Sequence, residues 1–424
     1  MTGPSATEGF YQQGEAFRTE ISTFRGNTVH SNVDTGFMFG HELMDDQDFS
    51  PGGGTDRCDP RLRPLDPDSP PGLNIVQELT AFKNIKQNTW NDCRATTFLT
   101  YKSSDAKLGL SLKHNCDVLD SIFIGESPNM GEPNMVRIRN GSQVMWPRST
   151  PGDRQQGMEY IGLHLYDGNP FVSGNTFADF RDDDYKNAGA IGFRKPHAGE
   201  WPTLFKNTKF DFEDGLEGNY VKGNERFSFG GIGDTERMGN IFDYDGTITG
   251  HAGWAVVRDQ PFYSSSWCEP RPHWGNMTSC PHRYVNAAGI GSGFAKIDMT
   301  ITRNDVIEWP EVNNIYKDPW HPKLSTDHSY IYSFPNSSQL NSHFDLSLEG
   351  LDSGHSLVVG ICVPLEAGPG DLSLGGSPRP VEVSSYEALS GDHTGTAYFW
   401  DREVGVIFRK FQVLQDKDHS DKET

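Results

Sequence analysis

The chain has 424 residues and a formal net charge of -21, from 58 acidic and 37 basic side chains. Such a molecule repels polyanions as a whole, which excludes a generic nucleic-acid-binding protein. Glycine (46 residues) and proline (26) are abundant, aromatic residues make up 12%, and no segment carries a sustained apolar stripe at the helical period. The composition therefore predicts an all-β protein.

From residue 24 onward, short strand-like segments end at asparagine or glycine and recur about every 20 to 25 residues. This spacing fits three short strands and three turns per coil, which is the pattern of a parallel β-helix. We expect the β-helix to occupy residues 1–310, with long polar loops inserted between its coils. Its asparagines are expected to form turns or internal ladders. They are Asn27, Asn32, Asn84, Asn175 and Asn207.

Acidic and imidazole side chains follow the coils in the middle of the chain. Hydrolysis of a glycosidic bond needs two carboxyl groups beside the bond, and a polysaccharide lyase needs a base and a cation for the uronate. Successive coils could align such groups on one face, with Arg181 and Arg194 binding a substrate carboxylate. Turn capping is the competing explanation for the aspartates. The catalytic candidates are Glu126, His164, Asp167, Asp179, Asp183 and His197.

A ten-residue segment, Phe242–His251, combines an Asp-x-Asp-Gly motif with alternating small and apolar residues. Asp243 and Asp245 could supply the hard oxygen ligands that calcium prefers. The segment is not an EF-hand, because the twelfth position of the loop is Trp254 and not glutamate. A turn capped by the two aspartates is the alternative. Calcium is the one cofactor that the sequence suggests, since no motif for an organic cofactor occurs.

Two cysteines, Cys268 and Cys280, bracket a loop with two prolines, and we expect a disulfide to close it. Tryptophans gather around this loop and could stack on sugar rings, although core packing is the commoner use of the residue. These tryptophans are Trp254, Trp267 and Trp274. The nearby histidines lack the spacing of a zinc site; they are His273, His282, His321 and His328.

Beyond residue 310, five strand-like runs with turn signals between them predict a small β-sandwich over residues 311–424. The charged tail from Gln415 onward is expected to be disordered.

Several features of the sequence indicate in which cellular compartment the protein works. Three N-glycosylation sequons begin at Asn140, Asn276 and Asn336. Six cysteines suit local disulfides in a secreted protein; besides Cys268 and Cys280, Cys93 could pair with Cys116, while Cys58 and Cys362 could remain thiols. The first residues do not form a signal peptide, and no run of about 20 apolar residues predicts a membrane span. An export signal is therefore expected elsewhere or in a longer parent chain.

Several short motifs, in order along the chain, resemble the cell-surface hyaluronidase family, which includes a cell-migration-inducing hyaluronan-binding protein. The similarity runs from about Asn27 to Phe411. Its signposts are Asn27–Asn32, Ile122–Ser127, Gly162–Gly168, Phe242–Thr249, Gly360–Pro364 and Tyr398–Phe408.

This resemblance implies a right-handed parallel β-helix followed by a β-sandwich, an extracellular setting, and binding or depolymerisation of hyaluronan with the help of calcium. It also implies that the chain corresponds to the C-terminal part of such proteins, without their glycine-rich N-terminal domain, so no catalytic residue is transferred from the family. If the chain is an enzyme, a hyaluronidase-type glycoside hydrolase is favoured over a lyase. The alternatives are a non-catalytic glycan-binding or matrix module and a self-sufficient polysaccharide hydrolase or lyase on the β-helix face.

Overall fold

A computed structural model describes the chain over a series of ranges. They are residues 24–32, 35–39, 74–84, 87–91, 96–112, 116–128, 135–139, 142–146, 158–165, 170–180, 186–193, 203–206, 208–211, 221–222, 241–271, 277–290, 299–308, 310–313, 322–334, 345–349, 354–363 and 380–412. The predicted disordered tail lies outside them.

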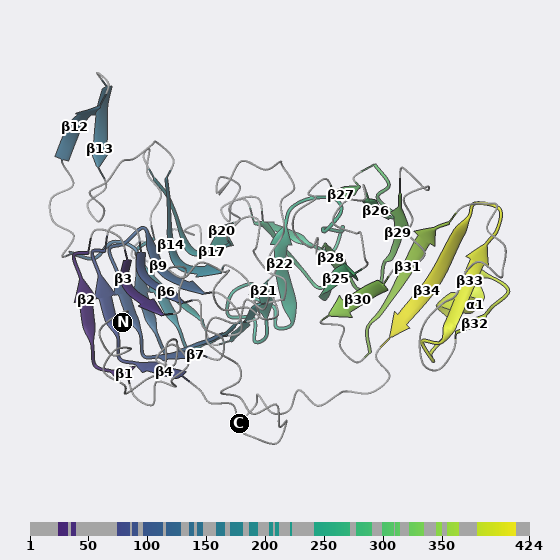
Figure 1. Cartoon of the computed structure of the whole chain (residues 1–424), viewed down its shortest axis with the longest axis horizontal. Coiled ribbons are helices and arrows are strands. Elements are labelled where there is room, and N and C mark those ends of the chain that lie inside the picture. The colour runs from purple at the N-terminus through teal and green to yellow at the C-terminus, as the bar shows by residue number, and fades with distance from the viewer. Residues whose placement is uncertain are drawn as a thin grey trace, which may run out of the picture.

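The first half of the molecule is a parallel β-helix, in which each coil adds one strand to each of three sheets (Figure 1). The first sheet contains β1 (Phe24–Arg25), β4 (Asn74–Gln77), β7 (Thr96–Leu99), β10 (Cys116–Leu119), β15 (Phe171–Ser173), β18 (Thr203–Lys206) and β21 (Ile241–Asp243). The second contains β2 (Thr28–His30), β5 (Thr80–Phe82), β8 (Lys102–Ser104), β11 (Ile122–Ile124), β16 (Thr176–Ala178) and β19 (Lys209–Asp211). The third contains β3 (Thr35–Phe39), β6 (Gln87–Asn91), β9 (Leu108–Leu112), β14 (Met158–Leu165), β17 (Lys186–Phe193) and β20 (Val221–Lys222).

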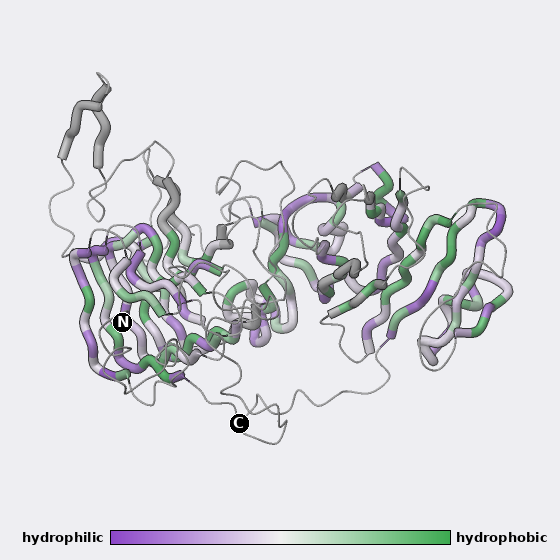
Figure 2. Tube along the Cα trace, viewed as in Figure 1, coloured by the Kyte–Doolittle hydropathy of each residue, from purple (hydrophilic) through white to green (hydrophobic). Residues whose placement is uncertain are grey.

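Side chains at equivalent positions of successive coils stack inside the β-helix. Phe98 pairs in register with Val118 in the first sheet, and Phe123 pairs with Phe177 in the second. These four side chains are fully buried, and the rings of Phe123 and Phe177 stack with centroids 5.0 Å apart. Hydrophobic and hydrophilic residues both occur along the coils (Figure 2), while burial alternates from residue to residue, as in β7 and β10. The alternation follows from the pleat, because successive side chains point to opposite faces of a strand.

Polar side chains and glycine shape the corners, as the sequence predicts. Asn32 donates from Nδ2 to Oδ1 of Asn84 at 2.8 Å, and Asn84 donates in turn to Oδ1 of Asn88 at 2.8 Å, so an asparagine ladder runs inside the coil. Asn175 accepts a hydrogen bond from the backbone N–H of Ser121 at 2.8 Å. At the corner between β15 and β16, Gly174 has a positive φ of 68°, and a Cβ atom there would lie 2.1 Å from Oδ1 of Asp120.

One hairpin is inserted between β11 and β14, formed by β12 (Met135–Arg139) and β13 (Ser142–Trp146). The parallel pairing of the first sheet ends at β21. Three antiparallel strands then extend that sheet, in the spatial order β22 (Trp254–Arg258), β24 (Met277–Cys280) and β23 (Glu269–Arg271). The boundary at residue 310 stays a prediction, while the change from parallel to antiparallel pairing comes between β21 and β22.

The C-terminal part contains two further sheets. The smaller one has β25 (Tyr284–Ile290) between β28 (Lys323–Ser325) and β30 (Asp345–Glu349). The larger one has the order β27 (Glu311–Asn313), β26 (Met299–Arg303), β29 (Ser329–Ser333), β31 (Ser356–Cys362), β34 (Val406–Gln412), β33 (Ala397–Asp401) and β32 (Val381–Glu382). One buried cluster takes side chains from both sheets, including Val285, Leu324, Tyr330 and Leu357. A short helix, α1 (Tyr386–Ser390), contributes Leu389 to a second cluster with Phe408 of β34.

Candidate functional site

The β-helix brings two of the predicted carboxylates to one corner. Glu126 follows β11 and Asp179 follows β16, and these strands are neighbours in the second sheet. The backbone N–H of Glu126 donates to the carbonyl oxygen of Asp179 at 3.1 Å, and both residues are half-buried. Asp179 has a positive φ of 56°, which is a conformation that aspartate tolerates at a turn. The two carboxyl-bearing residues therefore occupy successive coils at the same edge.

His164 lies apart from that corner. It is only 2% exposed, and its Nδ1 lies 3.0 Å from Oγ of Ser111 on the neighbouring strand β9. A buried imidazole in this position cannot contact a polysaccharide. Five other residues predicted for this face lie outside the described residues: Asp167, Asp183, His197, Arg181 and Arg194.

The Asp-x-Asp-Gly motif forms the turn that ends the parallel β-helix. The carboxylate of Asp243 is fully buried and accepts four hydrogen bonds, from the N–H groups of Gly246, Ile248 and Thr249 and from the Thr249 hydroxyl. Burial raises the pKa of the Asp243 carboxyl, and the donors on Thr249 and Ile248 oppose this. Asp245 accepts from the N–H and the hydroxyl of Thr247. Both carboxylates thus act as turn caps, and calcium binding by them stays a prediction.

The predicted tryptophans have different environments. Trp254 stacks on His251, with ring centroids 4.2 Å apart, and is half-buried. Trp267 is 75% exposed, the largest value among the exposed large hydrophobic residues that the structure describes. Trp274 lies outside the described residues, as do the sequon asparagines Asn140, Asn276 and Asn336.

The predicted disulfide between Cys268 and Cys280 is present. It ties β24 to the end of the loop that carries Trp267. Cys362 is a half-buried thiol whose pKa is raised by burial. Cys116 is buried, and its sulfur accepts a hydrogen bond from Nδ2 of Asn91 at 2.9 Å. Cys58 and Cys93 lie outside the described residues, so the pairing of Cys93 with Cys116 stays a prediction.

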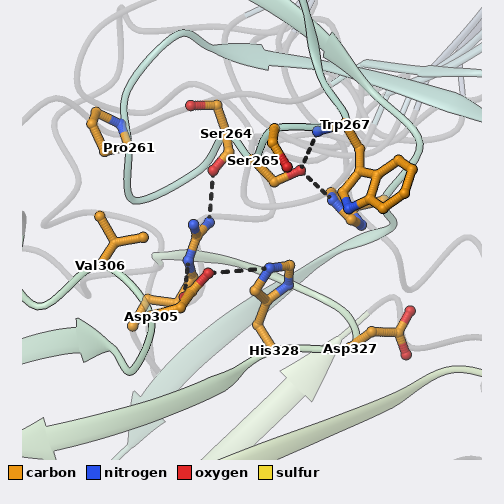
Figure 3. A pocket seen from close by; sticks show the side chains of 11 residues that line it. Pro261, Ser264, Ser265, Trp267, Asp305, Val306, Asp327 and His328 are labelled. Carbon is orange, nitrogen blue, oxygen red and sulfur yellow. Dashed lines mark hydrogen bonds and ion pairs between the residues drawn. The ribbon is translucent and has the colours of Figure 1, made fainter.

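Trp267 lines a cleft of about 610 Å³ beside this disulfide (Figure 3). The loop between β22 and β23 forms one wall, where Ser264 and Tyr263 donate backbone hydrogen bonds to the carbonyl oxygen of Gln260. The turn after β26 and the turn between β28 and β29 form the facing wall. The lining residues are Pro261, Ser264, Ser265, Ser266, Trp267, His282, Arg303, Asp305, Val306, Asp327 and His328.

Arg303 links the two walls. It is 2% exposed and donates from Nε to Oδ1 of Asp305 at 2.6 Å. Its Nη1 donates to the carbonyl oxygens of Phe262 at 3.0 Å and Ser264 at 2.9 Å, which holds the Trp267 loop against the opposite turn. A buried guanidinium needs such partners, because an unpaired buried charge is strongly unfavourable.

Two histidines meet on the inner side of the cleft. The rings of His282 and His328 are in edge-to-face contact with centroids 5.1 Å apart. Nδ1 of His328 lies 3.1 Å from the carbonyl oxygen of Thr326, which can only accept, so Nδ1 is assigned the proton. Nε2 of His328 then faces Oδ2 of Asp305 at 3.8 Å. On the other ring, Nε2 of His282 lies 2.9 Å from the Ser265 hydroxyl.

Burial lowers the pKa of His282, and the neighbouring His328 and Arg303 lower it further against the opposing Asp327 and Asp305. The cleft therefore offers hydroxyls, carboxylates, two imidazoles and an exposed indole face. Nowhere in the described ranges do three or more His, Cys, Asp or Glu residues gather as a metal site would require. The sequence does not predict His282 and His328 as residues of one cleft, since their spacing argues only against zinc. They are brought together by strand pairing in the C-terminal sheets, and no local sequence signal reports that pairing.

Comparisons with known proteins return distant relatives. Cell surface hyaluronidase CEMIP2 of Homo sapiens is 24% identical over 92% of this chain, and a protein of Dictyostelium discoideum is 25% identical over 66% of it. The chain spans less than a third of their lengths, 30% of the first and 26% of the second. No family model matches the chain. Most of this chain is thus distantly homologous to part of a cell-surface hyaluronidase.

Proposed function

We propose that this chain is an extracellular glycan-handling module that binds hyaluronan or a related polysaccharide, and that it belongs to the cell-surface hyaluronidase family as a C-terminal portion. The observation that carries the proposal is the exposed indole of Trp267 on the rim of a cleft lined by serines and carboxylates. Aromatic faces contact the apolar surface of sugar rings, and convergent polar groups then bind the hydroxyls. The distant similarity to a cell-surface hyaluronidase supports the choice of ligand.

The disulfide between Cys268 and Cys280 supports an extracellular location, because such bonds persist in oxidising compartments. Across the described ranges, no helix combines the length and apolar character that a bilayer crossing requires.

Binding of the whole chain to immobilised high-molecular-weight hyaluronan tests the proposal. We expect Trp267→Ala to weaken binding by about tenfold, since an exposed aromatic stacked on a ligand contributes roughly 1 to 2 kcal/mol. Tyr244→Ala is the matched control, because Tyr244 is an exposed aromatic residue on the turn that ends the parallel β-helix. No binding by the unmodified chain to any glycosaminoglycan would overturn the proposal.

Glycan cleavage is the second candidate function, favoured by the carboxylates of Glu126 and Asp179 on successive coils. Coils repeat at about 4.8 Å, and a retaining glycosidase holds its two carboxyl groups about 5 to 5.5 Å apart. If the chain cleaves hyaluronan, Glu126→Gln and Asp179→Asn will each abolish the shortening of the polymer, measured by gel filtration with and without a chelator. Binding without shortening would leave a non-catalytic glycan-binding or matrix module.

A further inference from the structure

Histidines surround the charged groups of the cleft. His282 and His328 are in ring contact, and Nε2 of His328 lies 3.8 Å from Oδ2 of Asp305. A third histidine, His355, places Nδ1 4.0 Å from Oδ2 of Asp327. We call His282, His328 and His355 the histidine cluster. Three separate segments supply it, and each member lies beside a carboxylate or another member.

Arg303 supplies a buried positive charge with spare donor capacity. Its Nε and Nη1 are engaged by Asp305 and by two backbone carbonyl groups. Its Nη2 has no hydrogen-bond partner among the described residues, although the side chain lines the cleft and is 2% exposed. A guanidinium nitrogen in this state is suited to a carboxylate or another planar anion.

The balance of charge around Arg303 depends on the histidine cluster. An ordinary imidazole is mostly neutral at about pH 7.5, so Arg303 then faces the two negative charges of Asp305 and Asp327, which repel an anionic ligand. Protonation of His328 and His355 adds positive charge beside the same carboxylates, whereas burial makes His282 resist a proton. The sign of the local charge is then reversed.

We propose that the cleft binds the carboxylate of an acidic sugar through Arg303, and that protonation of His328 and His355 switches this binding on. The inference rests on the proposed function, because the sugar ring is held by Trp267. Protonated His328 and His355 neutralise Asp305 and Asp327, which otherwise repel the bound carboxylate. A charge within about 4 to 6 Å of a ligand alters its affinity substantially.

All charged groups that face the cluster take part in this balance. Protonation of His282 is opposed by the neighbouring His328 and Arg303, and it is favoured by Asp327 and Asp305. His328 faces Asp305, and the hydroxyl of Ser325 lies 3.1 Å from its Nδ1. His355 faces Asp327 and lies 3.4 Å from the hydroxyl of Thr326.

Calorimetric titration of the whole chain with two sugars tests the inference. One is a short hyaluronan oligosaccharide, and the other is the same oligosaccharide with its carboxyl groups reduced to alcohols. At constant ionic strength, we expect the uronate form to bind about tenfold more tightly at about pH 5.5 than at about pH 7.5. A sugar carboxylate is still largely ionised at the lower pH. The reduced form should show no such gain.

The double variant His328→Gln/His355→Gln should lose the acid gain, and His393→Gln, an exposed histidine that does not line the cleft, should keep it. If the double variant does not fold, the single variant His355→Gln, beside Asp327, should still reduce the gain. A gain that survives in these variants, or that the reduced sugar shares, overturns this inference alone. Failure of both sugars to bind at either pH overturns the proposed function together with it.

Discussion

The imidazole rings of His282 and His328 meet edge to face with centroids 5.1 Å apart, although one residue precedes β25 and the other follows β28. These strands are adjacent in the smaller C-terminal sheet, where Tyr284 pairs with Ser325. The contact is therefore a direct result of strand register, and it sets the chemistry of one side of the cleft.

The lowered pKa of His282 predicts how stability depends on pH. Above the pKa of an unfolded histidine, near 6.5, both states hold the ring neutral and the group has no effect. As the pH falls below that value, the unfolded chain takes up a proton that the folded chain resists, so the free energy of unfolding decreases. Urea denaturation at about pH 7.5 and about pH 5.5 should show this decrease, and His282→Gln should make it smaller. An unchanged slope in His282→Gln, compared with His393→Gln, would contradict the assignment.

Replacement of Asp243 should destabilise the end of the parallel β-helix. Asp243→Ala removes the acceptor for three backbone N–H groups and one hydroxyl, and leaves buried donors such as the N–H of Ile248 without a partner. We expect a loss of about 2 to 4 kcal/mol in the free energy of unfolding. Asp245→Ala, whose carboxylate caps Thr247 in an exposed turn, should cost about 1 kcal/mol or less. Equal losses of unfolding free energy for the two substitutions would show that burial of Asp243 does not increase its contribution to stability.

Calcium binding by the same motif can be tested separately. The hydrogen bonds to Asp243 occupy its carboxylate oxygens, so calcium would have to displace them. A melting temperature that rises with calcium and falls on chelation, and that responds to neither in Asp243→Ala, would establish the metal site. The absence of such a response would leave the motif as a turn capped by its own backbone donors.

The aromatic stack inside the coils should contribute strongly to stability. Phe123 is fully buried and contacts Phe177 and Tyr101, with ring centroids 5.0 and 5.7 Å away. Phe123→Ala should lower the free energy of unfolding by about 3 to 5 kcal/mol, through lost burial and a residual cavity. Ile122→Ala is the control in the same strand, because Ile122 is 41% exposed on the opposite face. Similar losses of unfolding free energy for both variants in denaturant titrations would argue against the register in which Phe123 faces the core.

The disulfide should matter for both stability and binding. Cys268→Ser/Cys280→Ser opens the loop that carries Trp267 and should lower the free energy of unfolding by about 2 to 4 kcal/mol. Hyaluronan binding should weaken at the same time, because the wall of the cleft is no longer tied to β24. Cys362→Ser, at a half-buried thiol in β31, is the control for loss of a sulfur atom. Full binding by the double variant would place the ligand elsewhere.

Much of the fold can be predicted from the sequence. Asparagine and glycine at the corners, recurring apolar residues such as Phe123 and Phe177, and coil lengths of about 20 residues indicate a parallel β-helix, because each coil repeats the same local requirements. The disulfide between Cys268 and Cys280 can also be predicted, since the two cysteines are close in the chain.

The candidate site could be predicted only in part. The sequence predicts Trp267 as a site residue because it lies in a polar loop that contains prolines. It also predicts His164, whose side chain suits acid–base chemistry, but this side chain is buried beside Ser111. Whether a side chain in a strand faces the solvent depends on what covers that face, and local sequence does not encode the cover.

The repeating coil, its polar corners and the disulfide loop follow from local sequence, because each depends on residues near one another in the chain or repeated at a fixed interval. Tertiary packing is what buries Asp243 as a cap and brings Arg303, Asp305, His282 and His328 into one cleft with Trp267. These contacts depend on the long-range register of β25, β26 and β28, and that register is set by packing of the whole C-terminal core.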